Sequence, residues 1–147
     1  MKKYFNYILI LPGVVAFFTA CVKDLTGTVY TGPDVVEIYG TSLPLAKTIT
    51  TTTTPKLDSF LVQLVGKQRS TATNITFEVA ATSTAVATTD YVINTPSPIA
   101  LPANSSSVWV KVTFNKVSSQ KTLIINLTGG DNVQPSQNYK TFTFNLK

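Results

Sequence analysis

Apolar and polar residues alternate in short stretches along the chain from residue 34 onward. In residues 107–115, valines and a phenylalanine occupy every second position, and Trp109, Lys111 and Thr113 lie between them. Because the side chains of a β-strand point alternately to its two sides, this period of two indicates strands that bury one face. The pattern predicts strands in the residue ranges 34–39, 45–53, 57–65, 74–80, 91–93, 99–101, 107–115, 121–127 and 139–146.

Glycine and proline separate these predicted strands, at positions such as Gly40, Pro55, Gly66 and the pair Gly129-Gly130. No segment between them shows the period of a helix. Strands at such close spacing are typical of antiparallel sheets that pack face to face. The sequence therefore predicts an all-β fold, a two-sheet antiparallel immunoglobulin-like sandwich.

The first 20 residues have the pattern of an export signal. Lys2 and Lys3 give a positive start, and residues 4–20 are almost wholly apolar, interrupted by Pro12-Gly13. This apolar stretch is at the lower limit for a membrane-spanning helix, which needs about 17–25 residues, and a proline at its middle would break such a helix. A positive start, an apolar centre and small residues before a cleavage point are typical of a cleaved signal.

Cys21 is the only cysteine, and it ends a lipobox-like sequence, Phe-Phe-Thr-Ala-Cys. We predict that residues 1–20 are a lipoprotein signal peptide and that Cys21 is lipidated with acyl chains such as palmitate, which would anchor the protein to a membrane. Val22 follows the cysteine in place of an aspartate, which favours sorting to the outer membrane. Two alternatives are an ordinary cleaved signal with an unmodified cysteine and an uncleaved anchor helix.

The rest of the chain is long enough for one domain with a continuous core. Of the 147 residues, 44% are hydrophobic and only 13% are charged, which argues against disorder along the whole chain. We predict a flexible stalk in residues 21–33 and a β-sandwich domain in residues 34–147. A short strand over residues 28–30 is the alternative for part of the stalk.

The charge pattern argues against a nucleic-acid partner. The formal net charge is +5, and Lys2 and Lys3 contribute two of these charges, leaving +3 for the chain after the signal. The remaining basic residues are scattered singly. No cluster of them could neutralise a row of phosphates.

The residue types also argue against catalysis. The chain contains no histidine, which removes the commonest general base, the histidine-based nucleophile systems and the usual zinc ligand. Cys21 is expected to be acylated and so provides no thiol nucleophile. No glycine-rich loop precedes a helix to hold a phosphate. We therefore predict a protein that is not an enzyme, with no cofactor and no metal site.

Trp109 is the residue that the sequence suggests for ligand binding. Alternation places it opposite Val108 and Val110, on the outer face of a sheet. An outward tryptophan can stack on a sugar ring or anchor a protein partner. The favoured interpretation is that Trp109 only covers the sheet, beside Tyr139 or the stem of a lysine, and the binding role is the alternative.

Three segments carry a resemblance to a known domain: residues 75–79 (ITFEV), 87–91 (ATTDY) and 99–103 (IALPA). Followed by the strands at 108–114 and 123–127, they resemble a Calx-β-like, immunoglobulin-like sandwich. With the lipobox, the whole chain resembles a small Bacteroidota-type surface lipoprotein of uncharacterised function. The resemblance implies the same two-sheet fold.

The resemblance also raises the question of calcium, because calcium-binding members of that group gather several carboxylates in loops at one end of the sandwich. Calcium takes about six to eight oxygen ligands, whereas the carboxylates after Cys21 occur singly along the chain. A site at Asp131-Asn132 with loop carbonyls is the alternative. The favoured interpretation is that these residues, and Asp90 likewise, form turns or caps by bonding to the backbone.

Two hypotheses of function follow. The first is a non-catalytic binding or interaction module displayed on the cell envelope, with a glycan or an envelope protein as its partner. The second is a structural spacer or a subunit of a surface assembly, in which an exposed edge strand would add to a neighbouring sheet.

Overall fold

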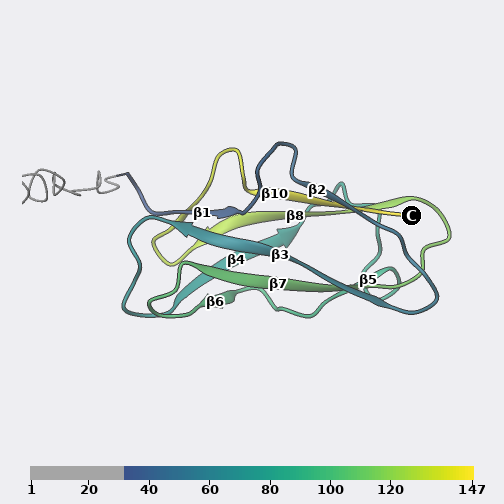
Figure 1. Ribbon diagram of the computed structural model, residues 1–147, viewed down its shortest axis with the longest axis horizontal. Coiled ribbons are helices and arrows are strands. Elements are labelled where there is room, and N and C mark those ends of the chain that lie inside the picture. Colours follow the sequence, from purple (N-terminus) through teal and green to yellow (C-terminus); the bar gives the residue numbers. More distant parts are fainter. Residues whose placement is uncertain (1–31) are drawn as a thin grey trace, which may run out of the picture. The chain divides into compact units, whose positions relative to one another are not determined.

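The chain forms strands and no helix in residues 32–147, the part that the computed structural model describes (Figure 1). The predicted signal peptide (residues 1–20), Cys21 and nearly all of the predicted stalk (residues 21–33) lie outside this part. Within residues 32–147, no helix is long and apolar enough to cross a membrane.

Two five-stranded sheets contain the strands of this part of the chain. Sheet A consists, in spatial order, of β5 (Tyr91–Ile93), β7 (Ser107–Phe114), β3 (Lys56–Val65), β1 (Val35–Ile38) and β9 (Gln134–Pro135). Sheet B consists, in spatial order, of β2 (Ala46–Ile49), β10 (Thr141–Leu146), β8 (Lys121–Gly130), β4 (Thr73–Val79) and β6 (Ile99–Leu101). The prediction of an all-β, two-sheet fold is confirmed.

The strands pair antiparallel, as predicted, except at two places. β1 pairs in parallel with β9, and β2 pairs in parallel with β10. Each pair joins the start of the domain to its end, so a long connection returns the chain in the same direction, which a hairpin cannot do. Close spacing of strands predicts hairpins between strands that follow one another in the sequence. It does not indicate pairing between strands at opposite ends of the domain. β9, which contains Pro135, is not among the predicted strands.

The chain changes from sheet A to sheet B between β1 and β2. Gly40 lies there against the buried Leu45, and a Cβ atom at Gly40 would overlap that side chain. Glycine therefore permits the close approach. β2 ends at Ile49, earlier than the predicted end at residue 53, because the next five residues are all threonine and add no apolar side chain to the core.

β8 continues through the glycine pair that the sequence predicts to be a turn. The pairing register between β4 and β8 shifts between Thr76 and Phe77, which marks a β-bulge. Gly129 has a φ of 107°, and a Cβ atom at Gly130 would overlap the Asn74 carbonyl. The two glycines therefore extend the strand through a bulge instead of ending it.

The inner faces of the two sheets share one hydrophobic core. Phe60 stacks on Phe142, with 5.3 Å between ring centroids, and Phe114 approaches Phe144 to 4.8 Å. Because Phe60 and Phe114 belong to sheet A and the other two rings to sheet B, these contacts hold the sheets face to face. Phe142, Phe144 and Leu146, which alternation assigns to the inner face, are buried as predicted.

Two leucines provide a matched test of this assignment of faces. Leu123 of β8 is fully buried, whereas Leu57 of β3 is 60% exposed. Leu123→Ala should lower the free energy of unfolding by about 2–5 kcal/mol, because it leaves a cavity in the core. Leu57→Ala should change it by less than about 0.5 kcal/mol. Urea denaturation of the full chain measures both values, and equal effects of the two substitutions would contradict the assignment.

Candidate functional site

Trp109 lies on the outer face of sheet A, as the alternation predicts, and 53% of it is exposed. Its cross-strand partner is Leu61 of β3. On the other side of Leu61 lies Tyr39, whose backbone N–H donates to the Leu61 carbonyl at 2.9 Å. Tyr39 is 56% exposed, and Leu61 is half-buried. We call these three residues the aromatic row.

The aromatic row runs from β7 across β3 to the residue that follows β1, because β3 lies between β7 and β1 (Figure 1). The sequence identifies Trp109 but not Tyr39 or Leu61. Alternation within residues 34–39 and 57–65 does place both on an outer face, yet only the pairing register aligns them with Trp109. Tyr139, the predicted neighbour of Trp109, packs against the hydrophobic core instead.

Polar residues flank the aromatic row on both sides. On one side the amide of Gln63 donates to the carboxylate of Glu37 at 2.6 Å. On the other side Ser59 pairs with Lys111 across β3 and β7. The row is therefore an apolar strip between two lines of hydrogen-bonding groups.

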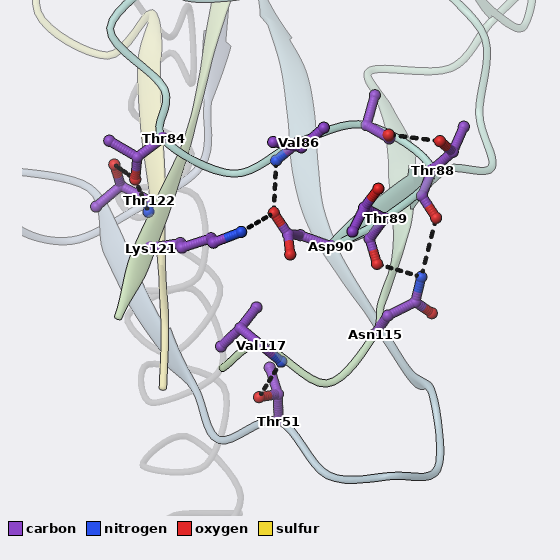
Figure 2. A network of polar contacts seen from close by, with 11 residues as sticks. Thr51, Thr84, Val86, Thr88, Thr89, Asp90, Asn115, Val117, Lys121 and Thr122 are labelled. Carbon is purple, nitrogen blue, oxygen red and sulfur yellow. Dashed lines mark hydrogen bonds and ion pairs between the residues drawn. The ribbon is translucent and has the colours of Figure 1, made fainter. Parts of the chain in front are cut away.

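Asp90 lies in the turn just before β5 and forms a buried polar contact with the first residue of β8 (Figure 2). It is only 2% exposed. Its Oδ2 atom accepts hydrogen bonds from the Lys121 ammonium and from the Val86 backbone N–H, each at 2.7 Å. The Asp90 carbonyl accepts from the N–H of Asn115, whose amide donates to the Thr89 carbonyl at 2.9 Å. The prediction that Asp90 is a turn residue bonded to the backbone is confirmed.

The surroundings of Asp90 decide its charge. Burial by itself would raise the pKa of this carboxyl group, but the hydrogen bond from Lys121, the hydrogen bond from Val86 and the charge of the ammonium together outweigh burial and lower the pKa below its ordinary value. Burial raises the pKa of the neighbouring Tyr91. Asp90 is therefore a fixed anion that ties β5 to β8, and sequence reasoning did not identify Lys121 as its partner.

Arg69, in the loop between β3 and β4, organises the opposite end of the sandwich. Its guanidinium donates to the Asp131 carbonyl at 2.6 Å and to the Asn132 carbonyl at 2.8 Å. The same group pairs with the carboxylate of Asp34 at 3.0 Å. The Asp131 carboxylate accepts from the backbone N–H of Asn74 at 3.0 Å. Arg69 thus joins the residue just before β1 to the loop after β8.

These contacts do not fit a calcium ion at either end of the sandwich. The carbonyls of Asp131 and Asn132, which the alternative calcium site would need, accept hydrogen bonds from Arg69. At the other end, Lys121 already neutralises Asp90. Within residues 32–147, no three His, Cys, Asp or Glu side chains lie close enough to hold a metal ion. Calcium also needs about six to eight oxygen ligands.

A polar groove of about 470 Å³ lies beside Lys121 at the surface of sheet B. Threonine, asparagine, glutamine and lysine side chains line it, with Leu146 as its one apolar residue. No aromatic ring lines this groove, so a flat apolar ligand would find nothing there to stack on. The aromatic row is the better candidate for binding.

The buried ion pair gives a pH-dependent prediction. Lys121→Met should lower the free energy of unfolding near pH 7 by about 3–5 kcal/mol, because it leaves Asp90 buried without a cation. Since folding lowers the pKa of Asp90, the ion pair stabilises the fold fully above the unfolded value of about 3.9 and loses that contribution as the pH falls through the folded value. The difference between wild type and Lys121→Met should therefore shrink in acid.

Lys47→Met is the matched control, because Lys47 pairs with Asp58 at the same distance, 2.7 Å, but is half exposed. It should cost at most about 1 kcal/mol. Denaturant unfolding across a pH series measures both variants. The measured quantity is the difference in free energy of unfolding between wild type and Lys121→Met. If it is small at pH 7, or does not change with pH, Lys121 does not stabilise the buried Asp90 as an ion pair.

Calcium provides a second prediction. A ligand present at a hundred times its dissociation constant stabilises the fold by about 2.7 kcal/mol. A calcium site with a dissociation constant well below the calcium concentration used would therefore raise the unfolding midpoint. We expect millimolar calcium to leave the unfolding midpoint of the full chain unchanged relative to magnesium. A rise specific to calcium would show that the chain does gather a set of oxygen ligands.

No protein-family model matches the chain, and no curated protein matches it. Solved structures do match. The chain is similar to a structure described as the apo form of the Calx CBD1 domain, with a TM-score of 0.60 and 14% identity, over 78% of this chain and 96% of that one. It is also similar to CBD12 from CALX1.2, with a TM-score of 0.56 and 15% identity, over 77% of this chain and 44% of that longer one. These similarities establish a Calx-β-like sandwich fold.

Proposed function

We propose that this chain is a non-catalytic interaction module displayed at the cell envelope and anchored to the outer membrane by acyl chains on Cys21. The export-signal pattern and the lipobox-like sequence support the anchor. The similarity to Calx-β sandwiches supports a compact domain that presents its surface to a partner. The partner is a glycan or an envelope protein.

The observation that carries the proposal is the aromatic row. Trp109 and Tyr39 are both more than half exposed on one rigid sheet face. Aromatic rings provide large contact areas with little loss of side-chain entropy, and they are enriched at the centres of interfaces.

The acidic residues support a non-catalytic role. Asp34, Asp58 and Asp90 are each paired with a lysine or arginine. Burial alone would raise the pKa of Asp90, but the hydrogen bonds from Lys121 and Val86 lower it, and a carboxylate with a lowered pKa is a poor general base. The chain also has no histidine to replace it.

The proposed anchor sets how far the domain stands from the membrane. Residues 22–33 separate Cys21 from Asp34, which the Arg69 guanidinium holds at the edge of the sandwich. Twelve residues span at most about 40 Å when fully extended. That reach lets the aromatic row contact partners near the membrane surface.

The alternative, a structural subunit that adds strands to a neighbour, has less support. Within residues 32–147 the edge strands are short: β2 has four residues, β5 and β6 have three each, and β9 has two. Short edges offer few hydrogen bonds for strand addition.

Expression of the full chain in a bacterium with a lipoprotein export pathway tests the anchor. Wild type should incorporate labelled palmitate and sediment with outer membranes, and Cys21→Ser should do neither. Equal membrane association of both proteins would rule out the lipid anchor.

Trp109→Ala tests the interaction surface. It should weaken binding of the full chain to isolated envelope glycan and protein fractions by about tenfold, a loss of about 1.4 kcal/mol. Leu57→Ala is the control, because Leu57 is equally exposed on the same sheet face but lies outside the aromatic row. Binding that both variants retain would place the contact elsewhere on the molecule.

A further inference from the structure

The aromatic row has a fixed length. Trp109 and Tyr39 are separated by two steps between neighbouring strands, through Leu61. Each step is about 4.8 Å, so the two backbones lie about 10 Å apart. Leu61 is half-buried and shorter than either ring, so it forms a low apolar floor between two raised aromatic side chains.

The polar lines beside the row define what kind of ligand it fits. Gln63 and Glu37 lie on one side, and their hydrogen bond uses one amide hydrogen and the Oε1 atom. The second amide hydrogen of Gln63 and the Oε2 atom of Glu37 have no other partner among residues 32–147. Ser59 and Lys111 supply a hydroxyl group and an ammonium group on the other side. A ligand lying along the row would meet apolar surface below and hydrogen-bonding groups on both flanks.

An extended chain of pyranose rings has the matching chemistry. When the links between rings are equatorial, the chain is a flat ribbon whose faces present C–H groups and whose two edges present hydroxyl groups. The C–H faces stack on aromatic rings, and the edge hydroxyls bond to amides, carboxylates and ammonium groups. A chain with axial links curves away and would leave one of the two rings uncovered.

The size of the exposed apolar surface favours a glycan over a protein. An aromatic side chain covers about 150–250 Å² when fully buried, so the two half-exposed rings of the aromatic row offer on the order of 200 Å². Leu57 and Val92 are also exposed on this sheet face, but they lie beyond the line of Ser59 and Lys111. A stable protein interface needs about 800 Å² on each partner. The polar lines also interrupt the apolar surface on both sides, whereas the centre of a protein interface is a continuous apolar patch.

We propose that the aromatic row is a platform for an extended, equatorially linked glycan chain, which lies across the strands with one sugar ring on Trp109 and another on Tyr39. This inference rests on the proposed function and names the partner of the same surface. Gln63, Glu37 and Lys111 bind the hydroxyl groups at the edges of the chain. Leu61 fills the space beneath the sugar between the two stacked rings.

Titration of the purified full chain with defined oligosaccharides tests the platform. The detergent that keeps the chain in solution carries no sugar headgroup. The probes are β-1,4-linked oligomers of glucose, N-acetylglucosamine, xylose and mannose, from one ring to six, and α-1,4-linked glucose oligomers of the same lengths. Calorimetry gives the affinity, and quenching of the one tryptophan reports contact with Trp109. At least one β-linked series should bind, with an affinity that rises with length until both rings are covered and then levels off. The α-linked series should bind at least tenfold more weakly.

Variants separate the two ends of the platform. Trp109→Ala should reduce the affinity for a β-linked hexamer at least tenfold. Tyr39→Ala should do the same while leaving the binding of short oligomers, and their quenching of Trp109, unchanged. Tyr39→Phe should keep the affinity within about threefold, because the ring is retained. Leu57→Ala is the matched control and should have no effect, and equal unfolding midpoints would show that all four variants fold.

The inference is overturned if no β-linked series binds, if α-linked oligomers bind equally well, or if Tyr39→Ala leaves the dependence on length intact. These results are distinct from failure of the proposed function. If no oligosaccharide binds but Trp109→Ala still abolishes binding to an envelope protein, the surface is a protein contact and the interaction role stands. If the wild-type chain binds neither class of partner, both proposals fail.

Discussion

Burial of the inner face of β3 determines what its outer face presents. Phe60, Val62 and Leu64 are buried between the sheets. A slip of one residue would move these side chains to solvent and turn Leu61 and Gln63 inward, so the core fixes the pairing register of β3 with both of its neighbours. That register places Leu61 between Trp109 and Tyr39. The surface that we propose to bind a ligand is therefore a consequence of how the core packs.

The two ends of the sandwich are closed by cationic side chains. Lys121 holds the buried Asp90 at one end, and Arg69 holds Asp34 and two loop carbonyls at the other. In both places the oxygen atoms that a metal ion would need already contact a positive side chain. The loops are thus ordered by the chain itself. This leaves the sheet face, and not the loops, as the surface best suited to a ligand.

The sequence predicts the parts of the structure that depend on local patterns. Alternation places Trp109 outside and Phe144 inside, and glycine and proline mark most of the strand boundaries. Pairing between distant segments leaves no such local pattern. Tyr39 and Trp109 meet only through Leu61, and Lys121 lies 31 residues from Asp90 along the chain. For the same reason the parallel pairing of β1 with β9 and of β2 with β10 could not be predicted.

The lipobox-like sequence lies outside residues 32–147, so the membrane anchor is still a prediction.

The central claim is that the outer face of sheet A is the contact surface. Mapping of backbone and side-chain chemical shifts by NMR, during titration with the tightest-binding β-linked oligomer, tests it most directly. The largest changes should fall on the Trp109 indole N–H and on the backbone of Tyr39 and Leu61, with sheet B unaffected. Changes centred on Lys121 and the polar groove of sheet B would contradict it.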